Sequence, residues 1–460
     1  MRSFRLSWPS LVVLGLGFAL LCSGSFVSLY DSGVYLSAAE RLVSGVLPYS
    51  DFRFVQPPGF LLWLAPAGLV GLVSPFWGLL VAALQSLLVS VLVVELCVRL
   101  LPGRNGRVSG WVAALVPAAA FVLVSAKLEP LMLLLWLLVF REFSGRCRPF
   151  LLGLFVGLAV DVKLWSVALV LALFVVGWSR GGAWLRRVVA GGVVAALVLV
   201  PFVVLSPVGF FRDVVSLQLG RRAMRFESFP LVQRVADLTG WPLGSVVFGF
   251  VVCCVVAVVV GLFVMSWRSW VPVLRLVFLA WLGVAVELLV APESYPYYFY
   301  VSGVLFSILF AVVFVSVVPA VSGRLLWVGA CAVSVVFFAL VASAGYPGSE
   351  SRFAARVPEG CVQFVVPGQS FLLGRPLCAS AVVDPYAAGF GRGSHVVDLP
   401  SFVRFWESRL SGDSGVVSPS RWSTNLPFRR ASFRRWFSRR FRLVFARPGF
   451  FVFSRGVLGA

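Results

Sequence analysis

Long apolar runs recur along the first 345 residues of the chain, and short polar or basic loops separate them. A run of about 20 apolar residues can cross a bilayer as a helix, because a helix satisfies its own backbone hydrogen bonds in lipid. Charged residues make up only 12% of the chain, about half the share of a soluble domain. The sequence therefore predicts an α-helical polytopic membrane protein with about 11 transmembrane helices. The expected spans include those at 11–29, 76–100, 110–125, 131–140, 243–265, 271–290, 299–318 and 325–344.

The two ends of the chain predict its orientation in a plasma (inner) membrane. The N-terminus, MRSFR, is basic and precedes the first apolar run, so the positive-inside rule places it in the cytoplasm. We interpret that run as an uncleaved helix and not as a signal peptide, because no small-residue cleavage site precedes Asp31. An odd number of spans then places residues 346–460, which follow the membrane domain 1–345, on the extracytoplasmic side.

The C-terminal residues 346–460 have the pattern of a small α/β domain. CVQFVV and SAVVDP are typical of short strands, Ser401–Leu410 of a helix, and FRLVFARPGFFVFSR of a hairpin that turns at Pro448 and Gly449. Cys361 and Cys378 could pair in a disulfide if this domain faces an oxidising compartment. The sequence shows no Cys/His spacing of a metal site, so we expect no required cofactor.

The net charge of +21 is large for a chain of this length. In a soluble protein such an excess would suggest a nucleic-acid partner. Here many of the basic residues lie in short loops and in the C-terminal part, where membrane orientation and anionic lipid headgroups explain them better. Membrane lipids, and no nucleic acid, are therefore the expected partners.

A polar insert runs from Tyr30 to Phe60, directly after the first apolar run. Asp31 stands where an N-cap is expected, and Gln56-Pro57-Pro58-Gly59 ends the insert. The short apolar run Pro58–Val73 follows, which is typical of a re-entrant or interfacial helix. Apolar side chains recur within the insert at helical spacing, at Val34, Leu36, Ala38, Leu42 and Val46.

Counting spans places many ionisable residues at the extracytoplasmic face, where each costs several kcal/mol unless it is paired or meets water. Lys127 with Glu129, and Asp161 with Lys163, can equally be local pairs or interface anchors. Glu287 lies within a span and is harder to explain in that way. The full set is Asp31, Asp51, Lys127, Glu129, Asp161, Lys163, Glu287, Glu293 and the arginines of the outer loop 206–241.

Four segments of the insert together resemble the first outer loop of the GT-C glycosyltransferases: Asp31–Tyr35, GVLPY at Gly45–Tyr49, Asp51 and Gln56–Gly59. The chain is most similar to the bacterial members related to protein mannosyltransferases and lipid A aminoarabinose transferases. The resemblance is specific over residues 30–63 and architectural beyond them. It implies a GT-C-like enzyme of the cell envelope that moves a sugar, of mannose or arabinose type, from a polyprenyl-phosphate carrier to a glycan, lipid or protein acceptor.

The resemblance also implies roles for individual residues. Asp31 in the outer loop 30–60 would be the general base of an inverting displacement. The family's Glu is Ser32 here, and its common Lys before Pro-Pro is Gln56, so Lys163 or an arginine of the outer loop would have to bind the carrier phosphate. Some related enzymes hold a divalent cation near the Asp. The residues expected at the substrate or carrier are Tyr35, Asp51, Gln56, Lys127, Glu129, Asp161, Lys163, Arg221, Arg222, Arg225, Glu287, Tyr297 and Tyr298.

Three alternatives remain open from the residues themselves. A transporter or flippase of a lipid-linked or anionic substrate would use the same charges as a pathway, although no inverted repeat is visible in the sequence. A non-catalytic scaffold of envelope assembly would use the C-terminal domain as a binding module. An interfacial aromatic belt is the commoner explanation of Tyr297 and Tyr298, which could otherwise stack against a sugar.

Overall fold

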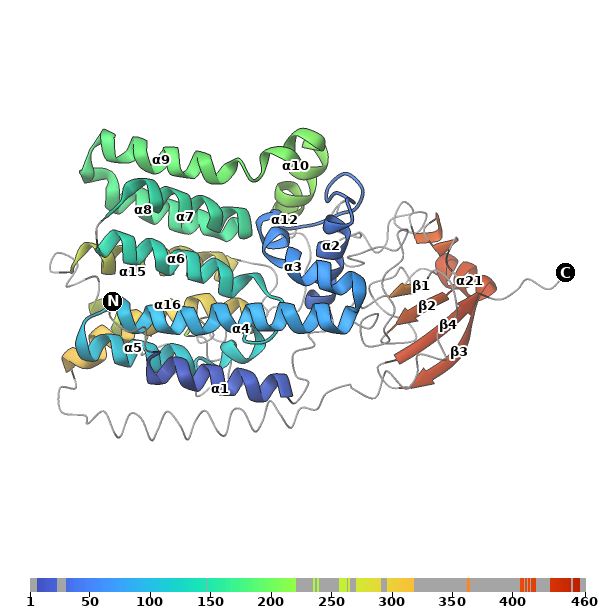
Figure 1. Cartoon of the computed structure of the whole chain (residues 1–460), viewed down its shortest axis with the longest axis horizontal. Helices are drawn as coiled ribbons and strands as arrows, with labels where there is room; N and C mark the ends of the chain where they lie inside the picture. Colours follow the sequence, from blue (N-terminus) through green and yellow to red (C-terminus); the bar gives the residue numbers. More distant parts are fainter. Residues whose placement is uncertain are drawn as a thin grey trace. The chain divides into compact units, whose positions relative to one another are not determined.

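The computed structural model divides into two compact units, which are described here one at a time (Figure 1). Unit 1 comprises Met1–Ser25, Ala83–Leu199 and Phe226–Gly345. Unit 2 comprises Phe26–Ala82, Val200–Arg225 and Tyr346–Ala460. The residues that the structure describes are 6–22, 30–145, 147–220, 235, 238–239, 256–262, 264, 270–290, 296–317, 362–364, 406–408, 410–411, 413, 415–418, 431–447 and 450–455.

Unit 1 is built from apolar helices, as the runs in the sequence predict. Three helices of the described part of the chain are long and apolar enough to cross a membrane: Pro75–Leu100, Pro272–Val290 and Phe299–Ser316. The expected spans at 243–265 and 325–344 lie largely or wholly outside the described residues. The main helices are α1 (Trp8–Cys22), α4 (Pro75–Leu100, from Ala83), α5 (Gly103–Leu115), α6 (Leu128–Ser144), α7 (Pro149–Val162), α8 (Val167–Gly177), α9 (Gly182–Ala196), α15 (Pro272–Val290) and α16 (Phe299–Val317).

Helix α7 lies between α6 and α9, and glycines allow its close approach to α9 (Figure 1). A Cβ atom on Gly191 would collide with the carbonyl of Phe150, and one on Gly153 would collide with the carbonyl of Val188. Both obstacles are backbone atoms, which cannot move aside. Small residues bring helices together in this way in membranes, where apolar area alone gives little drive for association.

A carboxylate of α4 holds the start of α1. Glu95 accepts hydrogen bonds from the Ser7 N–H at 2.9 Å and the Ser10 hydroxyl at 2.8 Å through one oxygen. Its other oxygen accepts from Arg99 Nε at 2.6 Å. The first N–H groups of a helix have no acceptor within that helix. Glu95 of α4 supplies such an acceptor at the start of α1.

Two expected spans have different ends in the structure. The span expected at 110–125 begins earlier than expected, as α5 at Gly103, and ends at Leu115. A 3₁₀-helix, η1 (Pro117–Phe121), follows, because Pro117 has no N–H with which to continue α5. The span expected at 131–140 is longer than predicted, since α6 covers Leu128–Ser144.

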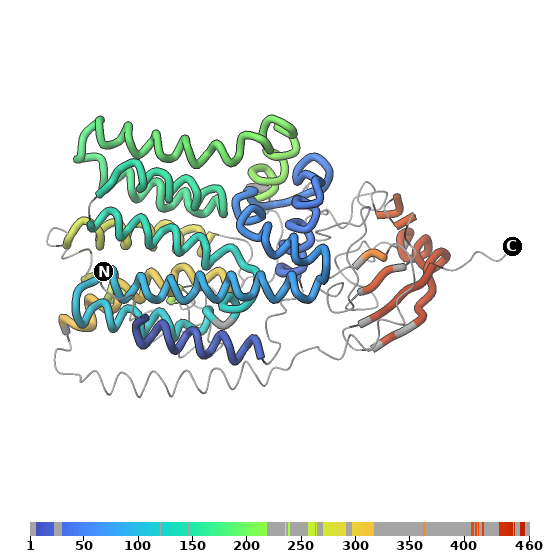
Figure 2. Tube along the Cα trace, viewed as in Figure 1, coloured from blue at the N-terminus to red at the C-terminus, as the bar shows by residue number. Residues whose placement is uncertain are grey.

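The membrane-side part of unit 2 pairs α2 (Asp31–Val43) with α3 (Gly59–Val73), which Figure 2 shows as neighbouring coils. The short apolar run after the insert is therefore helical, as expected. A second segment of unit 2 follows residue 200 as a chain of short helices. These are α10 (Val200–Leu205), α11 (Pro207–Phe210), the π-helix η4 (Phe211–Ser216) and α12 (Leu217–Gly220).

The C-terminal part of unit 2 contains a four-stranded mixed sheet in the order β1-β2-β4-β3. The hairpin expected around Pro448 and Gly449 is confirmed, because β3 and β4 on its two sides pair antiparallel. The predicted strand SAVVDP lies outside the described residues, whereas 406–408 and 410, within the predicted helix, are helical. The elements are β1 (Val362–Phe364), β2 (Gly415–Ser418), α21 (Ala431–Arg440), β3 (Phe441–Arg447) and β4 (Phe450–Arg455).

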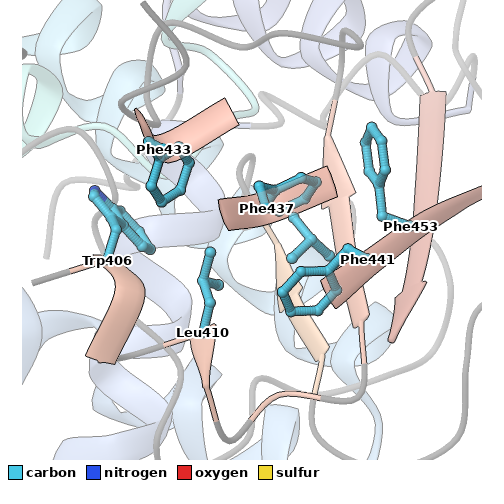
Figure 3. Packing of buried hydrophobic residues seen from close by; sticks show 7 residues of the cluster. Trp406, Leu410, Phe433, Phe437, Phe441 and Phe453 are labelled. Carbon is cyan, nitrogen blue, oxygen red and sulfur yellow. The ribbon is translucent and has the colours of Figure 1, made fainter. Parts of the chain in front are cut away.

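An aromatic core holds α21 on this sheet (Figure 3). The Phe437 ring stacks on Phe441 with 4.8 Å between ring centroids, and it meets the Phe453 ring edge-on at 5.2 Å. Large buried rings contribute most of the burial energy of a small domain. The cluster consists of Trp406, Leu410, Val416, Phe433, Phe437, Phe441 and Phe453.

Candidate functional site

A buried polar cluster in unit 1 contains both lysines of the chain. The sequence has 39 basic residues, and all but these two are arginines. We call the group the lysine cluster. Its members are Lys127, Glu129, Lys163, Trp165, Glu287, Tyr297 and Tyr298, and we include Asp161 because it stands two residues before Lys163 in the sequence.

The start of α6 positions the first part of the lysine cluster. Lys127 has an extended backbone directly before the helix, with φ −124° and ψ 146°. Glu129 follows in the first helical turn, where the helix dipole favours a negative charge. Both side chains are buried. Burial of two ionisable groups costs free energy that apolar residues at the same positions would not cost.

The end of α7 positions Lys163. The helix ends at Val162, and Lys163 is extended and donates its N–H to the Ala159 carbonyl at 3.0 Å. A short turn after it is fixed by Ser166, whose hydroxyl donates to the same carbonyl at 2.9 Å. Trp136 of α6 in turn donates its indole N–H to the Ser166 hydroxyl at 3.0 Å. Two helices thus hold the backbone that carries Lys163.

The charged atoms of the lysine cluster lie against one another and against aromatic rings. Lys163 Nζ is 2.5 Å from Glu129 Oε1, and it lies 3.7 Å from the Trp165 ring centroid and 4.5 Å from that of Tyr298. Lys127 Nζ lies 3.6 Å from the Tyr297 ring centroid. A cation over an aromatic face is stabilised by the ring quadrupole. The sequence allowed Asp161 as the local partner of Lys163, but the ion pair in the structure joins Lys163 to Glu129.

Three carboxylates of the cluster each have a buried oxygen without a hydrogen-bond donor among the described residues: Glu129 Oε2, Asp161 Oδ2 and Glu287 Oε2. Glu287 is close enough to Lys163 for an electrostatic interaction, and Asp161 stands two residues before Lys163. Buried polar atoms are almost always satisfied, and exceptions mark places where a ligand can supply the missing partner. Hydroxyl groups are suitable donors to such oxygens.

In unit 2, Tyr49 fixes the loop between α2 and α3. Its backbone has φ 70°, a left-handed conformation that is uncommon for a residue with a side chain. The Tyr49 hydroxyl donates to the Gln56 carbonyl at 2.6 Å, and the Tyr49 carbonyl accepts from the Ser206 hydroxyl at 3.1 Å. The ring meets Phe210 edge-on at 5.0 Å. Burial raises the pKa of Tyr49 well above its usual value, so the hydroxyl remains a donor.

The segment after residue 206 supports this loop through polar contacts that the sequence analysis did not single out. Asp213 is fully buried and binds the neighbouring Arg212 through both oxygens, with Nε to Oδ1 at 2.6 Å and Nη2 to Oδ2 at 3.0 Å. This pairing raises the pKa of Arg212. Gln218 Nε2 donates to the Val55 carbonyl at 2.7 Å. The only sequence signal was an Arg-Asp pair within the outer loop 206–241.

The residues of the GT-C-like motif differ from one another in their burial and in their contacts. Asp31 is half-buried and begins α2, but Tyr30 is the N-cap residue and no side chain caps the helix, so the predicted N-cap role of Asp31 is wrong. Tyr35 is buried with its ring edge-on to Phe54 and Phe60. Gln56 is also buried.

Asp51 is exposed and closes its own turn. It accepts from the Leu47 N–H at 2.8 Å and from the Ser50 hydroxyl at 3.1 Å. These two hydrogen bonds show that Asp51 stabilises its own turn.

Glu40 is a buried carboxyl that the sequence analysis did not select. It lies on α2 opposite Gly71 of α3, where any Cβ would collide with its Oε1 atom. That oxygen has no hydrogen-bond partner among the described residues. Burial raises the pKa of Glu40 to about 8, against the opposing effect of the neighbouring Arg41 charge.

Several expected residues lie outside the described part of the chain: Arg221, Arg222, Arg225, Glu293, Cys361 and Cys378. Among the residues that are described, no group of three or more Asp, Glu, His or Cys side chains is placed to hold a metal ion.

No protein-family model and no curated protein matches the chain. Two solved structures of ArnT from Cupriavidus metallidurans do, each at 16% sequence identity and a TM-score of 0.59. The structure bound to undecaprenyl phosphate covers 98% of this chain and 99% of its own, and the apo structure covers 96% and 97%. This chain therefore has the fold of these two ArnT structures, and the polytopic helical membrane architecture expected from its sequence is confirmed.

Proposed function

We propose that the chain is an integral-membrane glycosyltransferase that takes a sugar, of mannose or arabinose type, from a polyprenyl-phosphate carrier. The observation that carries the proposal is the lysine cluster. It combines two buried ammonium groups, aromatic faces and three buried carboxylate oxygens without donors. The fold supports the carrier class, because ArnT has been solved bound to undecaprenyl phosphate.

The lysine cluster matches the parts of such a donor by charge and hydrogen bonding. Lys127 and Lys163 would bind the phosphate as point charges. The free oxygens of Glu129, Asp161 and Glu287 would accept hydrogen bonds from sugar hydroxyls, which donate well to carboxylates. A phosphate alone would leave these oxygens unsatisfied. A sugar phosphate therefore fits the cluster better than a simple anion.

We assign the general base to Asp31 on the sequence motif of residues 30–63 alone: in the proposed reaction it takes the proton of an acceptor hydroxyl. The acceptor oxygen forms a bond to the anomeric carbon from the face opposite the phosphate, which inverts that centre. The carbon–oxygen bond to the phosphate breaks, and its electron pair leaves with the polyprenyl phosphate. Lys127 and Lys163 stabilise the added negative charge. Tyr49 and Gln218 hold the loop that follows α2.

We place the reaction on the extracytoplasmic side of the plasma (inner) membrane, with the N-terminus in the cytoplasm. The acceptor is a glycan, lipid or protein of the cell envelope. The transporter alternative has no support from the fold comparison, because the matched structures are of a transferase.

The test uses the purified full chain in lipid nanodiscs with a panel of polyprenyl-phosphate sugars, including mannosyl and arabinosyl donors. Release of free polyprenyl phosphate is measured by mass spectrometry. We expect one donor to be consumed, and Lys127→Gln to raise the KM for that donor at least tenfold while Lys127→Arg, which keeps the charge, raises it less. Arg186→Gln, on the exposed surface of α9, is the matched control. Movement of an intact lipid-linked sugar across a vesicle bilayer, without release of the carrier, would instead establish a transporter.

A further inference from the structure

Both lysines of the chain stand where helical structure is interrupted. Lys127 lies at the end of the non-helical residues 122–127, which separate η1 from α6. Lys163 lies between α7 and the 3₁₀-helix η2 (Leu164–Ser166). Both have an extended backbone, with φ −124° and ψ 146° at Lys127 and φ −156° and ψ 131° at Lys163. The direction of each ammonium group therefore depends on how firmly the interruption beside it is held.

Interruptions of this kind leave carbonyl groups without the donors that a continuous helix would supply. Water supplies donors at a protein surface, but a buried backbone has to find them within the protein. Both interruptions are buried, since Ser125 near Lys127 and Ser166 near Lys163 are 6% and 0% exposed. We therefore looked for side chains that donate hydrogen bonds to these two segments.

A serine of α4 donates to the interruption that carries Lys127. The Ser86 hydroxyl lies 2.7 Å from the Ser125 carbonyl, although 39 positions separate the two residues in the sequence. The Ser125 hydroxyl in turn donates to the Phe121 carbonyl at the end of η1, at 2.6 Å. Ser86 is buried, so water competes little with this contact. The two hydrogen bonds fix the backbone two residues before Lys127.

A tryptophan and a serine hold the interruption that carries Lys163. Ser166 is the N-cap residue of α8, where a serine side chain commonly accepts from the helix, but its hydroxyl makes no cap. It donates instead to the Ala159 carbonyl at 2.9 Å, the same carbonyl that accepts the Lys163 N–H. Trp136 of α6 donates its indole N–H to this hydroxyl at 3.0 Å. The Ser166 hydroxyl thus connects α6 to the end of α7.

Ordinary helix geometry does not account for these contacts. A buried serine in a helix commonly donates to a carbonyl one turn earlier in the same helix, as Ser307 does to Val304 at 2.7 Å. The hydrogen bonds of Ser86 and Trp136 come from a different helix, and they end two and three residues from a lysine. The chain has only two lysines, and each has a contact of this kind beside it.

We propose that Ser86 is a positioning residue for Lys127. In the same way, Trp136 acts through Ser166 as a positioning residue for Lys163. Each acts on the backbone, and the backbone directs the ammonium group to its place in the lysine cluster. That this place serves the carrier phosphate rests on the proposed function, whereas the positioning itself does not.

The lysines allow a test that needs no activity. The full chain in lipid nanodiscs, with lysine labelled by ¹³C at Cε, has one side-chain signal from Lys127 and one from Lys163, which Lys127→Arg assigns. The two Nζ atoms lie 3.6 and 3.7 Å from aromatic ring centroids, and nuclei above an aromatic face resonate upfield. We expect Ser86→Ala to move the Lys127 signal downfield by more than the Lys163 signal, and Ser166→Ala to do the reverse. Equal movement of both signals, or none, would overturn the proposal.

Further variants separate the hydrogen bonds from general effects on packing. Trp136→Phe keeps the Ser166 hydroxyl and removes only its donor, so it should move the same lysine signal as Ser166→Ala. Ser86→Thr keeps a hydroxyl and should retain the wild-type spectrum. Ser307→Ala removes a buried hydroxyl of α16 and is the matched control, with both signals unmoved. Movement of the Lys127 signal in Trp136→Phe, with the Lys163 signal unmoved, would contradict the assigned pairs.

Kinetics with the polyprenyl-phosphate sugar donor connect the positioning to the proposed function. Ser86→Ala and Ser166→Ala should each raise the KM about 2- to 10-fold, the range for loss of one hydrogen bond. Their kcat should stay within about twofold of wild type, because binding and not the chemical step is weakened. Ser307→Ala should change neither constant. An unchanged KM in a variant whose lysine signal has moved would show that the position does not serve the carrier. If the wild type consumes no donor, the proposed function fails, and the lysine spectra still decide the positioning.

Discussion

Lys163 and Glu129 form an ion pair with both side chains buried, although 34 positions separate them in the sequence. Lys163 Nζ lies 2.5 Å from Glu129 Oε1. The pair connects the start of α6 to the end of α7, the two segments that place the chain's lysines. A buried pair rarely adds stability over an apolar pair, but loss of one partner is costly because the other charge stays buried.

Glu129→Gln is therefore expected to destabilise the protein by about 3–5 kcal/mol. Lys163→Gln should cost a similar amount, and the double variant should recover much of either loss, because no unpaired charge remains. Thermal unfolding of the four proteins in detergent measures this coupling as a double-mutant cycle. Losses that simply add would show that the two side chains do not interact. Transfer activity should stay low in all three variants, because each lacks a side chain that the proposal assigns to the sugar (Glu129) or to the phosphate (Lys163).

Asp31→Asn tests the proposed general base. The amide cannot accept the acceptor proton, so kcat should fall by about 10²–10⁴, with little change in thermal stability or in carrier binding. The measurement is single-turnover release of polyprenyl phosphate, with binding followed separately. Glu142→Gln, which removes the carboxylate that pairs with Arg148 at the far end of α6, is the control. Wild-type rates in Asp31→Asn would exclude Asp31 as the base.

Glu40 predicts a pH dependence of stability. Burial raises the pKa of Glu40 from its ordinary value of 4.5 to about 8 in the folded protein, so the folded state holds this proton more tightly than the unfolded chain does. The stabilising contribution of neutral Glu40 is complete below about pH 4.5 and is lost as the pH rises toward 8.

The comparison of wild type with Glu40→Gln isolates this contribution. Between pH 5 and 8 the wild type should lose stability relative to Glu40→Gln, with a slope of up to about 1.4 kcal/mol per pH unit. Denaturation midpoints over this range provide the measurement. A difference that does not change with pH would mean that Glu40 ionises alike in both states.

Gly191→Ala tests the close packing of α9 on α7. The new methyl group would meet the backbone of Phe150 and Leu154, and we expect a loss of about 1–3 kcal/mol as the helices separate. Gly182→Ala lies on the same helix with no atom near the new Cβ, so it should be neutral or slightly stabilising. Thermal unfolding distinguishes the two. An equal response of both variants would contradict tight contact at Gly191.

The sequence predicted those features that depend on local pattern. Pro448 and Gly449 separate two alternating runs, and β3 and β4 pair as that pattern requires. Counting spans also predicted that Lys127 and Lys163 would lie on one side, and their joint contacts with Tyr297 and Tyr298 agree with this.

Features that depend on tertiary contacts were not predictable in the same way. Lys163 pairs with Glu129 and not with Asp161, although Asp161 is nearer in the sequence. The reason is that α7 ends just before Lys163 and the backbone there becomes extended. The left-handed backbone of Tyr49 depends on a hydrogen bond from Ser206, more than 150 residues away. The sequence around Glu129 or around Ser206 contains no local pattern that predicts these contacts.

The cap that Glu95 places on α1 has a consequence for biosynthesis. The Ser7 N–H and the Ser10 hydroxyl find their acceptor 88 and 85 residues further along the chain. When the ribosome has produced only the first hydrophobic helix, the Glu95 acceptor does not yet exist. The N-terminal end of α1 can therefore form its final hydrogen bonds only after α4, which carries Glu95, has been synthesised.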